Sequence, residues 1–300
     1  MRRWAVCGCV LLLVGPVRAL YPAQGLNNGS RGRVACSTRG GGARCLRAAL
    51  EDTQVSYFTP LSREDTPSPG AKTRELPIFP LSLVTCPNGK CPLHIFEMRY
   101  RQLMNNIAGQ DNRFGIIMFD PNTQQIAGVG TVVEVVERSL LPDGRQLVMN
   151  IGRERFKLLR VTQEKPYMVG LVELGLVDEE PEEGQLLEGV RGSEARVWGL
   201  LQEVVRLSNK VYDKTKVTVS EDVARAAPAA AAAAARDQEE RARRSAFSFA
   251  VTEMLDIPPR AKQLMLQTLN IGERLDYQAE LLDKAQKFLA AQATLKDALG

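Results

Sequence analysis

The sequence has few of the side chains that most often carry metal or nucleophilic chemistry. Its 300 residues contain one histidine, His94, so mechanisms that need two histidines are excluded. Only two of the six cysteines, Cys86 and Cys91, lie beyond residue 50, which excludes a four-cysteine zinc site in the body of the chain. Neither a phosphate-binding Gly-x-x-x-x-Gly-Lys-Ser/Thr loop nor a Gly-x-Ser-x-Gly elbow occurs. We therefore expect no cofactor, no metal and no catalytic residue, and we place His94 in a short strand that leads into a helix.

Acidic residues are absent from residues 1–50, which contain eight arginines. A basic start followed by the apolar residues 4–17 is typical of a signal peptide, about 1–19, with cleavage predicted after Ala19. Residues 20–49 are rich in Arg, Gly, Ser and Ala, which is the composition of a transit peptide. This two-part leader resembles that of algae with complex plastids, so we expect the protein in a plastid, in the stroma. Secretion or a mitochondrial destination is the alternative.

The basic charge belongs to the leader rather than to the body of the chain. Without those eight arginines, residues 51–300 contain 31 Lys and Arg against 35 Asp and Glu, a net charge of −4. A slightly acidic body argues against binding nucleic acid through bulk charge. One local exception is the stretch with Arg153, Arg155, Lys157 and Arg160, which forms either a basic patch or the solvated face of a strand.

Residues 75–177 have the pattern of a small barrel of strands. Residues 1–74 are assigned to the leader and a flexible segment, the latter over 51–74. Beyond them, short β-branched runs alternate with turns, and one early helix is predicted from residue 96 to residue 107. Pro77 and Pro80 confine the first strand to an edge or a bulge. Several short strands with regular turns predict a barrel rather than a parallel α/β sheet.

Residues 178–300 are expected to be helical. The acidic run at 178–183 predicts a solvated linker and a domain boundary, with a docking site for a basic partner as the alternative. An Ala-rich stretch, about 224–244, is predicted to be an insertion. Leu275, Leu282 and Leu289 lie seven residues apart, which indicates a helix packed on its neighbours or an oligomer seam.

Six short motifs carry a resemblance to a known family. In chain order they are Leu76–Leu81, Pro92–Tyr100, Gly128–Thr131, Asp143–Arg145, Gly152–Phe156 and Pro166–Tyr167. Over 75–177 the chain is similar to the N-terminal, substrate-binding domain of Lon proteases, and residues 247–255 and 272–275 more loosely resemble the helical half of that domain. The resemblance implies an α+β fold, a PUA-like small β-barrel with an early helix, followed by a C-terminal helical bundle.

The motif residues are expected to be structural rather than reactive. The aromatic ones supply core, the glycines permit turns and bends, and Glu97 with Arg99 locks the first helix to the barrel. The set comprises Pro77, Phe79, Pro80, Phe96, Glu97, Arg99, Tyr100, Gly128, Gly130, Asp143, Gly144, Gly152, Arg155, Phe156 and Tyr167.

The resemblance implies a binding module rather than an enzyme. Lon proteases continue into an ATPase module and a Ser–Lys peptidase domain, and this chain has the motifs of neither. We expect a non-catalytic module that recognises unfolded or tagged polypeptides, as an adaptor or chaperone-like factor in plastid protein quality control, with an organellar protease as a further partner. No membrane span is expected in the mature protein. An RNA-binding PUA-like protein is the alternative, because PUA-like barrels include RNA binders.

Cys86 and Cys91 leave two alternatives open. They bracket an Asn-Gly turn, which folds the chain back on itself and brings two Cα atoms within the range that a disulfide requires. A short, exposed bridge of this kind would form a redox-sensitive clasp. The other alternative is a pair of free thiols, because this spacing matches no metal or catalytic motif.

Overall fold

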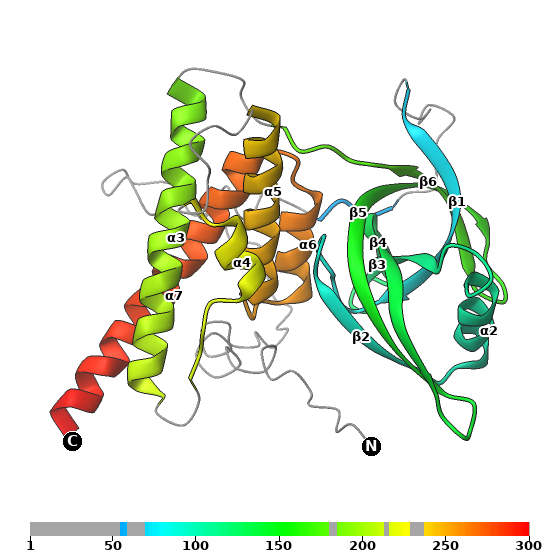
Figure 1. Cartoon of the computed structure of the whole chain (residues 1–300), viewed down its shortest axis with the longest axis horizontal. Helices are drawn as coiled ribbons and strands as arrows, with labels where there is room; N and C mark the ends of the chain where they lie inside the picture. The colour runs from blue at the N-terminus through cyan, green and yellow to red at the C-terminus, as the bar shows by residue number, and fades with distance from the viewer. Residues whose placement is uncertain (1–54, 59–69, 180–184, 213–215, 229–236, 300) are drawn as a thin grey trace, which may run out of the picture.

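A barrel of strands and a group of helices lie side by side in the computed structural model of the chain (Figure 1). The structure describes residues 55–58, 70–179, 185–212, 216–228 and 237–299. Within them the named strands occupy residues 72–174, and all helices but one follow from residue 185. The predicted cleavage site at Ala19, with the rest of the leader, lies outside the described residues.

Five of the strands close into a barrel, as the sequence predicts. The sheet order is β2-β5-β4-β3-β1-β6, and β6 also pairs with β5, so that the sheet closes on itself. β5 pairs with β2 through its first half and with β6 through its second half. The strands are β1 Lys72–Leu81, β2 Lys90–Ile95, β3 Arg113–Asp120, β4 Gln125–Leu140, β5 Gln146–Gln163 and β6 Met168–Leu174.

The first strand is not an edge strand, contrary to the expectation from its prolines. β1 pairs with β6 as far as Ile78 and with β3 from Ile78 onward. Pro77 therefore has a neighbouring strand only on the β6 side, and Pro80 only on the β3 side. A proline nitrogen can point to the open side at such a position without removing a ladder hydrogen bond.

Helix α2, Met98–Ile107, follows β2 and precedes β3 in the chain, and it packs on the barrel. The apolar side chains that it buries recur at helical spacing, as predicted, and are Tyr100, Leu103, Met104 and Ile107. The ring of Tyr100 stacks on that of Phe79 in β1, with centroids 3.6 Å apart. The prediction was wrong for Phe96, which precedes the helix and is 59% exposed rather than part of the core.

Two glycines of the barrel are required by geometry. A Cβ on Gly130 would lie 2.5 Å from the carbonyl oxygen of Ile116 and 2.5 Å from Cζ of Phe156, so this position in β4 accepts no side chain without a shift of the backbone. Gly144 has φ +80° in the turn that joins β4 to β5. This conformation strains any residue with a Cβ. The predicted hairpin turn at Leu141–Gly144 is therefore confirmed.

Helices from residue 185 onward form the second part of the molecule. α3 and α7 run side by side and parallel, because Ser193 Oγ donates to Asp276 Oδ1 at 2.6 Å near their starts and Lys210 Nζ donates to Asp297 Oδ2 at 2.6 Å near their ends. No helix of the described part is long and apolar enough to cross a membrane. The helices are α3 Gln185–Val211, α4 Glu221–Ala226, α5 Asp237–Met254, α6 Pro259–Gln267 and α7 Ile271–Leu299.

The core of the helical part confirms one alternative and corrects one prediction. Leu275, Leu282 and Leu289 are all buried among the helices, so their heptad spacing reflects core packing. The predicted insertion at 224–244 is too wide, because Ala226 in α4 is buried and Arg244 in α5 is 3% exposed. The alanine run at 229–235 lies outside the described residues.

Candidate functional site

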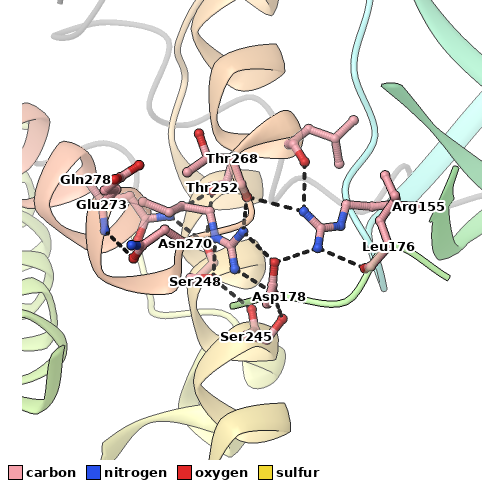
Figure 2. A network of polar contacts seen from close by, with 12 residues as sticks. Arg155, Leu176, Asp178, Ser245, Ser248, Thr252, Thr268, Asn270, Glu273 and Gln278 are labelled. Atoms are coloured by element: carbon pink, nitrogen blue, oxygen red, sulfur yellow. Dashed lines mark hydrogen bonds and ion pairs between the residues drawn. The ribbon is translucent and has the colours of Figure 1, made fainter. Parts of the chain in front are cut away.

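The barrel meets the helices at a buried arginine of β5. Arg155 is 3% exposed. Its Nη1 donates to the carbonyl oxygens of Leu266, at 3.0 Å, and Thr268, at 3.3 Å (Figure 2). Its Nη2 donates to the carbonyl oxygen of Leu176 at 3.0 Å and to Asp178 Oδ1 at 2.5 Å. A basic residue on the outer side of a strand thus points at the helical part rather than at solvent.

Asp178 joins this arginine to a second one, Arg274, in α7. Arg274 Nη2 lies 2.7 Å from Asp178 Oδ2, and its Nη1 lies 3.1 Å from Oδ1. The hydroxyl of Ser245 donates to the same carboxylate, and Arg274 Nε donates to Ser248 Oγ at 2.8 Å. We call Arg155, Asp178 and Arg274 the junction triad. The prediction of a solvated linker from residue 178 is wrong at its first residue, because Asp178 is only 7% exposed.

The electrostatic environment of the junction triad shifts the pKa values of Asp178 and Arg155. Burial by itself raises the pKa of Asp178, but the hydrogen bond from Arg274 and the charges of both guanidinium groups outweigh burial, so that the pKa lies below its usual value. Burial lowers the pKa of Arg155, and the carboxylate of Asp178 opposes that effect. An arginine with such a partner stays protonated.

The junction triad is a structural contact between the two parts of the molecule. The ring of Phe249 in α5 lies 4.0 Å from Cζ of Arg274 and 5.1 Å from Cζ of Arg155, which adds cation–π attraction. Both guanidinium groups and the carboxylate are engaged in hydrogen bonds with the chain itself. The arrangement therefore fixes the helices against the barrel and presents no nucleophile.

The structure does not contain the full basic patch predicted from Arg153, Arg155, Lys157 and Arg160. Arg155 is buried, and Arg153 Nε lies 2.9 Å from the carboxylate of Glu134 on β4. Lys157 and Arg160 remain exposed. Two isolated cations are a weak basis for binding a phosphate backbone. The structure thus removes Arg155 from the predicted patch and pairs Arg153 with Glu134, which weakens the local basis of the RNA-binding alternative.

Four apolar side chains are exposed where β2, α2 and the β4–β5 hairpin come together. Phe96 is 59% exposed, Met98 72%, Leu140 69% and Leu147 36%. Leu147 is the register partner of His94 in β2, and the ring of His94 lies 6.0 Å from that of Phe96. His94 thus lies in a short strand before the helix, as expected. We call Phe96, Met98, Leu140 and Leu147 the apolar rim.

Arg101 links the two segments that carry the apolar rim, namely the β2–α2 junction with Phe96 and Met98 and the β4–β5 hairpin with Leu140 and Leu147. Its Nε donates to the carbonyl oxygen of Phe96 at 3.1 Å, and its Nη1 donates to that of Asp143, in the hairpin turn, at 3.4 Å. Figure 1 shows the β4–β5 hairpin reaching past the barrel at the end where β2 continues into α2. The expected role of Glu97 and Arg99 is not found, because these two exposed side chains pair with each other at 2.8 Å rather than with the barrel.

Cys86 and Cys91 are free thiols in the structure, and both are buried. The predicted turn between them is present, with φ 63° at Asn88 and a 2.9 Å hydrogen bond from Gly89 N to the carbonyl oxygen of Cys86. Burial raises the pKa of the Cys86 thiol well above its usual value, and the negative charge of Glu253 adds to this effect. The exposed redox clasp is therefore not what the fold contains.

The sequence analysis did not predict most members of the junction triad or of the apolar rim. It expected Phe96 in the core and Arg155 on a wet face, and it did not single out Asp178 as a buried charge. One usable signal was present for Leu140, an apolar residue directly before a Leu-Pro-Asp-Gly turn, where polar residues are usual. A second signal was Arg155 itself, a charged residue inside one of the family motifs, where a structural role implies a buried partner.

The helical and barrel parts together match a known family. Residues 75–284 match the model of the ATP-dependent protease La (LON) substrate-binding domain. The chain is 26% identical to the Lon protease of Brevibacillus choshinensis over 226 residues, 72% of this chain and 26% of that protein. It is 22% identical to the Lon protease of Anaeromyxobacter dehalogenans over 236 residues, 76% of this chain and 25% of that protein. The chain thus spans about a quarter of the length of these relatives.

Solved Lon domains are also similar to this chain. The match to the crystal structure of a Lon N-terminal domain protein from Xanthomonas campestris has a TM-score of 0.47 at 18% identity, and it covers 68% of this chain and 95% of that one. The N-terminal domain of the Mycobacterium avium complex Lon protease matches with a TM-score of 0.40 at 12% identity, over 70% of this chain and 98% of that one. Because the family model matches well over half of its residues, the chain belongs to the LON substrate-binding domain family.

Proposed function

We propose that this protein is a non-catalytic module that binds unfolded or tagged polypeptides through the apolar rim, as an adaptor or chaperone-like factor. The observation that carries the proposal is a set of exposed apolar side chains around the β2–α2 junction and the β4–β5 hairpin, on a domain of a substrate-binding family. Exposed apolar groups gathered at one place on a soluble surface mark interaction sites. An unfolded chain offers the apolar side chains that such a cluster can remove from water.

The chemistry of the apolar rim suits a ligand without a fixed sequence. Phe96 and Met98 supply an aromatic ring and a flexible thioether, and a methionine side chain adapts to partners of different shape. Arg101, which joins the two halves of the apolar rim, keeps them in place through carbonyl oxygens rather than through side chains. Substitutions of the exposed residues should therefore change binding and leave the fold intact.

Binding is tested with fluorescently labelled α-lactalbumin that has been reduced and carboxymethylated, so that it stays unfolded. Burial of an exposed Phe or Leu side chain contributes about 1.5 kcal/mol, which corresponds to about tenfold in affinity. We expect Phe96→Ser and Leu140→Ser each to weaken binding, measured by fluorescence anisotropy, about three- to tenfold. The matched controls are Leu186→Ser and Leu295→Ser, at positions 73% and 63% exposed on α3 and α7, and these should bind like the unmodified chain.

Two results would contradict the proposal. Equal weakening by the control substitutions would mean that the apolar rim is not the binding surface. Cleavage of the same polypeptide by the purified chain in the presence of ATP would mean that the module is not a passive binder.

We further propose that the protein acts in a plastid, where an organellar protease would receive the bound polypeptide. The predicted two-part leader supports this location, and the burial of Val55 supports a second cleavage site upstream of that residue. A fluorescent protein fused behind residues 1–74 should collect in the plastid. Secretion of the fusion would show that the Arg-rich part of the leader is not a transit peptide.

A further inference from the structure

A short segment upstream of β1 is paired with β4, although residues 51–74 were expected to be a flexible segment. Within residues 55–58, the carbonyl oxygen of Ser56 accepts a hydrogen bond from Gly128 N at 2.7 Å, and Phe58 N donates to the carbonyl oxygen of Ile126 at 2.8 Å. The pairing is antiparallel. These residues thus form a β-bridge at Tyr57 and Ala127 against the barrel, and we call residues 55–58 the N-terminal strap.

The barrel itself leaves this part of β4 open. The pairing of β5 with β4 ends at Lys157, opposite Val129, whereas its pairing with β6 begins at Phe156 and continues to Gln163. On its other side β4 is covered by β3, which reaches Ile126 and Gln125. The stretch from Ile126 to Gly128 therefore has one unoccupied backbone edge, and the N-terminal strap takes it.

Side-chain packing and backbone hydrogen bonds both hold the N-terminal strap in place, because Tyr57 and Phe58 also pack against the barrel core. Val55 is 3% exposed and packs in the barrel core. Tyr57 Oη donates to Asp120 Oδ2 at 2.6 Å, and Ser56 N donates to Gln267 Oε1, at the end of α6, at 3.0 Å. The hydrogen bonds to β4 run between backbones, and any extended polypeptide can supply such bonds. This site therefore offers backbone pairing to an extended chain, together with apolar contacts for side chains such as those of Val55 and Phe58.

Space for a longer or bulkier strand lies beside the N-terminal strap. A cavity of about 500 Å³ is bounded by the strap, by Lys157 and Leu158 on β5, and by Leu269 and Asn270 between α6 and α7. Gly128 also lines it, and a Cβ there would come within 3.4 Å of the Ser56 carbonyl oxygen. This is an ordinary van der Waals distance, so the approach of the strap to β4 does not depend on a glycine at this position.

We propose that this groove, between β4, β5 and the connection from α6 to α7, takes an extended polypeptide by strand addition, and that the N-terminal strap occupies it as an intramolecular competitor. The inference rests on the proposed function, because it states where the backbone of a bound polypeptide pairs. The groove lies at the start of β4 and Leu140 of the apolar rim at its end, so the two sites contact different stretches of a bound polypeptide. The apparent affinity for a polypeptide equals the affinity of the free groove multiplied by the fraction of time for which the strap leaves the groove free.

Hydrogen exchange of the full chain tests the groove directly. The chain is compared alone and with reduced, carboxymethylated α-lactalbumin. We expect the bound polypeptide to remove the protection of the Phe58 amide, because the N-terminal strap leaves β4. The Gly128 amide should stay protected, because the polypeptide supplies a carbonyl oxygen in place of that of Ser56.

Two tyrosine variants provide a matched comparison. Tyr57→Phe removes the hydrogen bond to Asp120 and loosens the strap, whereas Tyr212→Phe removes a hydroxyl bond to Gln292 within the helical part. A hydrogen bond to a carboxylate is stronger than one to a neutral acceptor, so its loss frees the groove for a larger fraction of the time. We therefore expect Tyr57→Phe to bind the polypeptide about three- to tenfold more tightly, and Tyr212→Phe to bind it like the unmodified chain.

The possible results separate the inference from the proposed function. If the polypeptide binds, but residues 55–58 keep their protection and Tyr57→Phe has unchanged affinity, the groove is not a binding site and the proposed function stands. If the polypeptide does not bind at all, both are overturned.

Discussion

Asp178 accepts hydrogen bonds from two arginines that come from different parts of the chain. Arg155 belongs to the barrel and Arg274 to the last helix, and both side chains are almost fully buried with it. A buried charge is costly unless it is paired, so each member of the junction triad depends on the others. Loss of the carboxylate would leave two guanidinium groups close together without a counter-charge.

Asp178→Asn should therefore destabilise the protein strongly. Removing one partner of a buried ion pair costs about 3–5 kcal/mol in the free energy of unfolding. The control Asp283→Asn breaks an exposed i,i+4 pair with Lys287, which is expected to cost less than about 0.5 kcal/mol. Urea unfolding at pH 7 measures both. Similar losses for the two variants would show that the junction triad is not a stabilising contact.

At the scale of elements, β4 is a strand with close packing at one glycine and several pairing partners. It is covered by β3 and β5 along most of its length, and by the N-terminal strap where β5 departs. Gly130 lies where β3 and the ring of Phe156 approach the strand closely. By contrast, a Cβ on Gly199 in α3 would meet nothing within 4 Å.

Replacing these two glycines by alanine should change stability in opposite directions. Gly130→Ala forces a methyl group against the Ile116 carbonyl oxygen and is expected to cost about 1–3 kcal/mol, the range of overpacked core positions. Gly199→Ala should gain about 0.5–1 kcal/mol, because alanine is the better residue inside a helix. The midpoints of urea unfolding give both signs. A stable Gly130→Ala variant would contradict the packing described for β4.

At the scale of the whole molecule, the barrel and the helices depend on a charged contact that responds to pH. The pKa of Asp178 is lowered in the folded protein, so its contribution to stability is present above the pKa of an unfolded aspartate, about 3.9. That contribution is lost as the pH falls through the lower, folded value. Acid should therefore weaken the contact between the two parts.

The difference in unfolding free energy between the unmodified chain and Asp178→Asn isolates this effect. We expect the difference to be constant from about pH 5 to 7 and to shrink below about pH 4, where the aspartate of the unfolded chain becomes protonated. Other carboxylates with lowered pKa, such as Asp111 and Asp120, titrate in both proteins and cancel. Urea unfolding in steps from pH 3 to 7 provides the curve. A difference that grows toward low pH would contradict the assigned direction of the pKa shift.

Local patterns in the sequence were enough to predict a barrel followed by helices. Turn residues such as Asp143 and Gly144 and the heptad of buried leucines act within a few residues, so their physical effect can be seen in the sequence. The family resemblance placed motifs along both parts. None of this required knowledge of which distant residues meet.

Only the tertiary structure decided which side chains are buried charges, which apolar residues stay exposed and which strand fills the open edge of β4. Arg155 reaches a carbonyl 111 residues away, and Arg274 reaches a carboxylate 96 residues away. A charged residue in a strand gives no local sign of such a partner. Phe96 belongs to a helical pattern that begins two residues later, so its ring falls outside the buried face. Periodicity specifies which residues share a face of an element, whereas the packing of whole elements determines what that face meets.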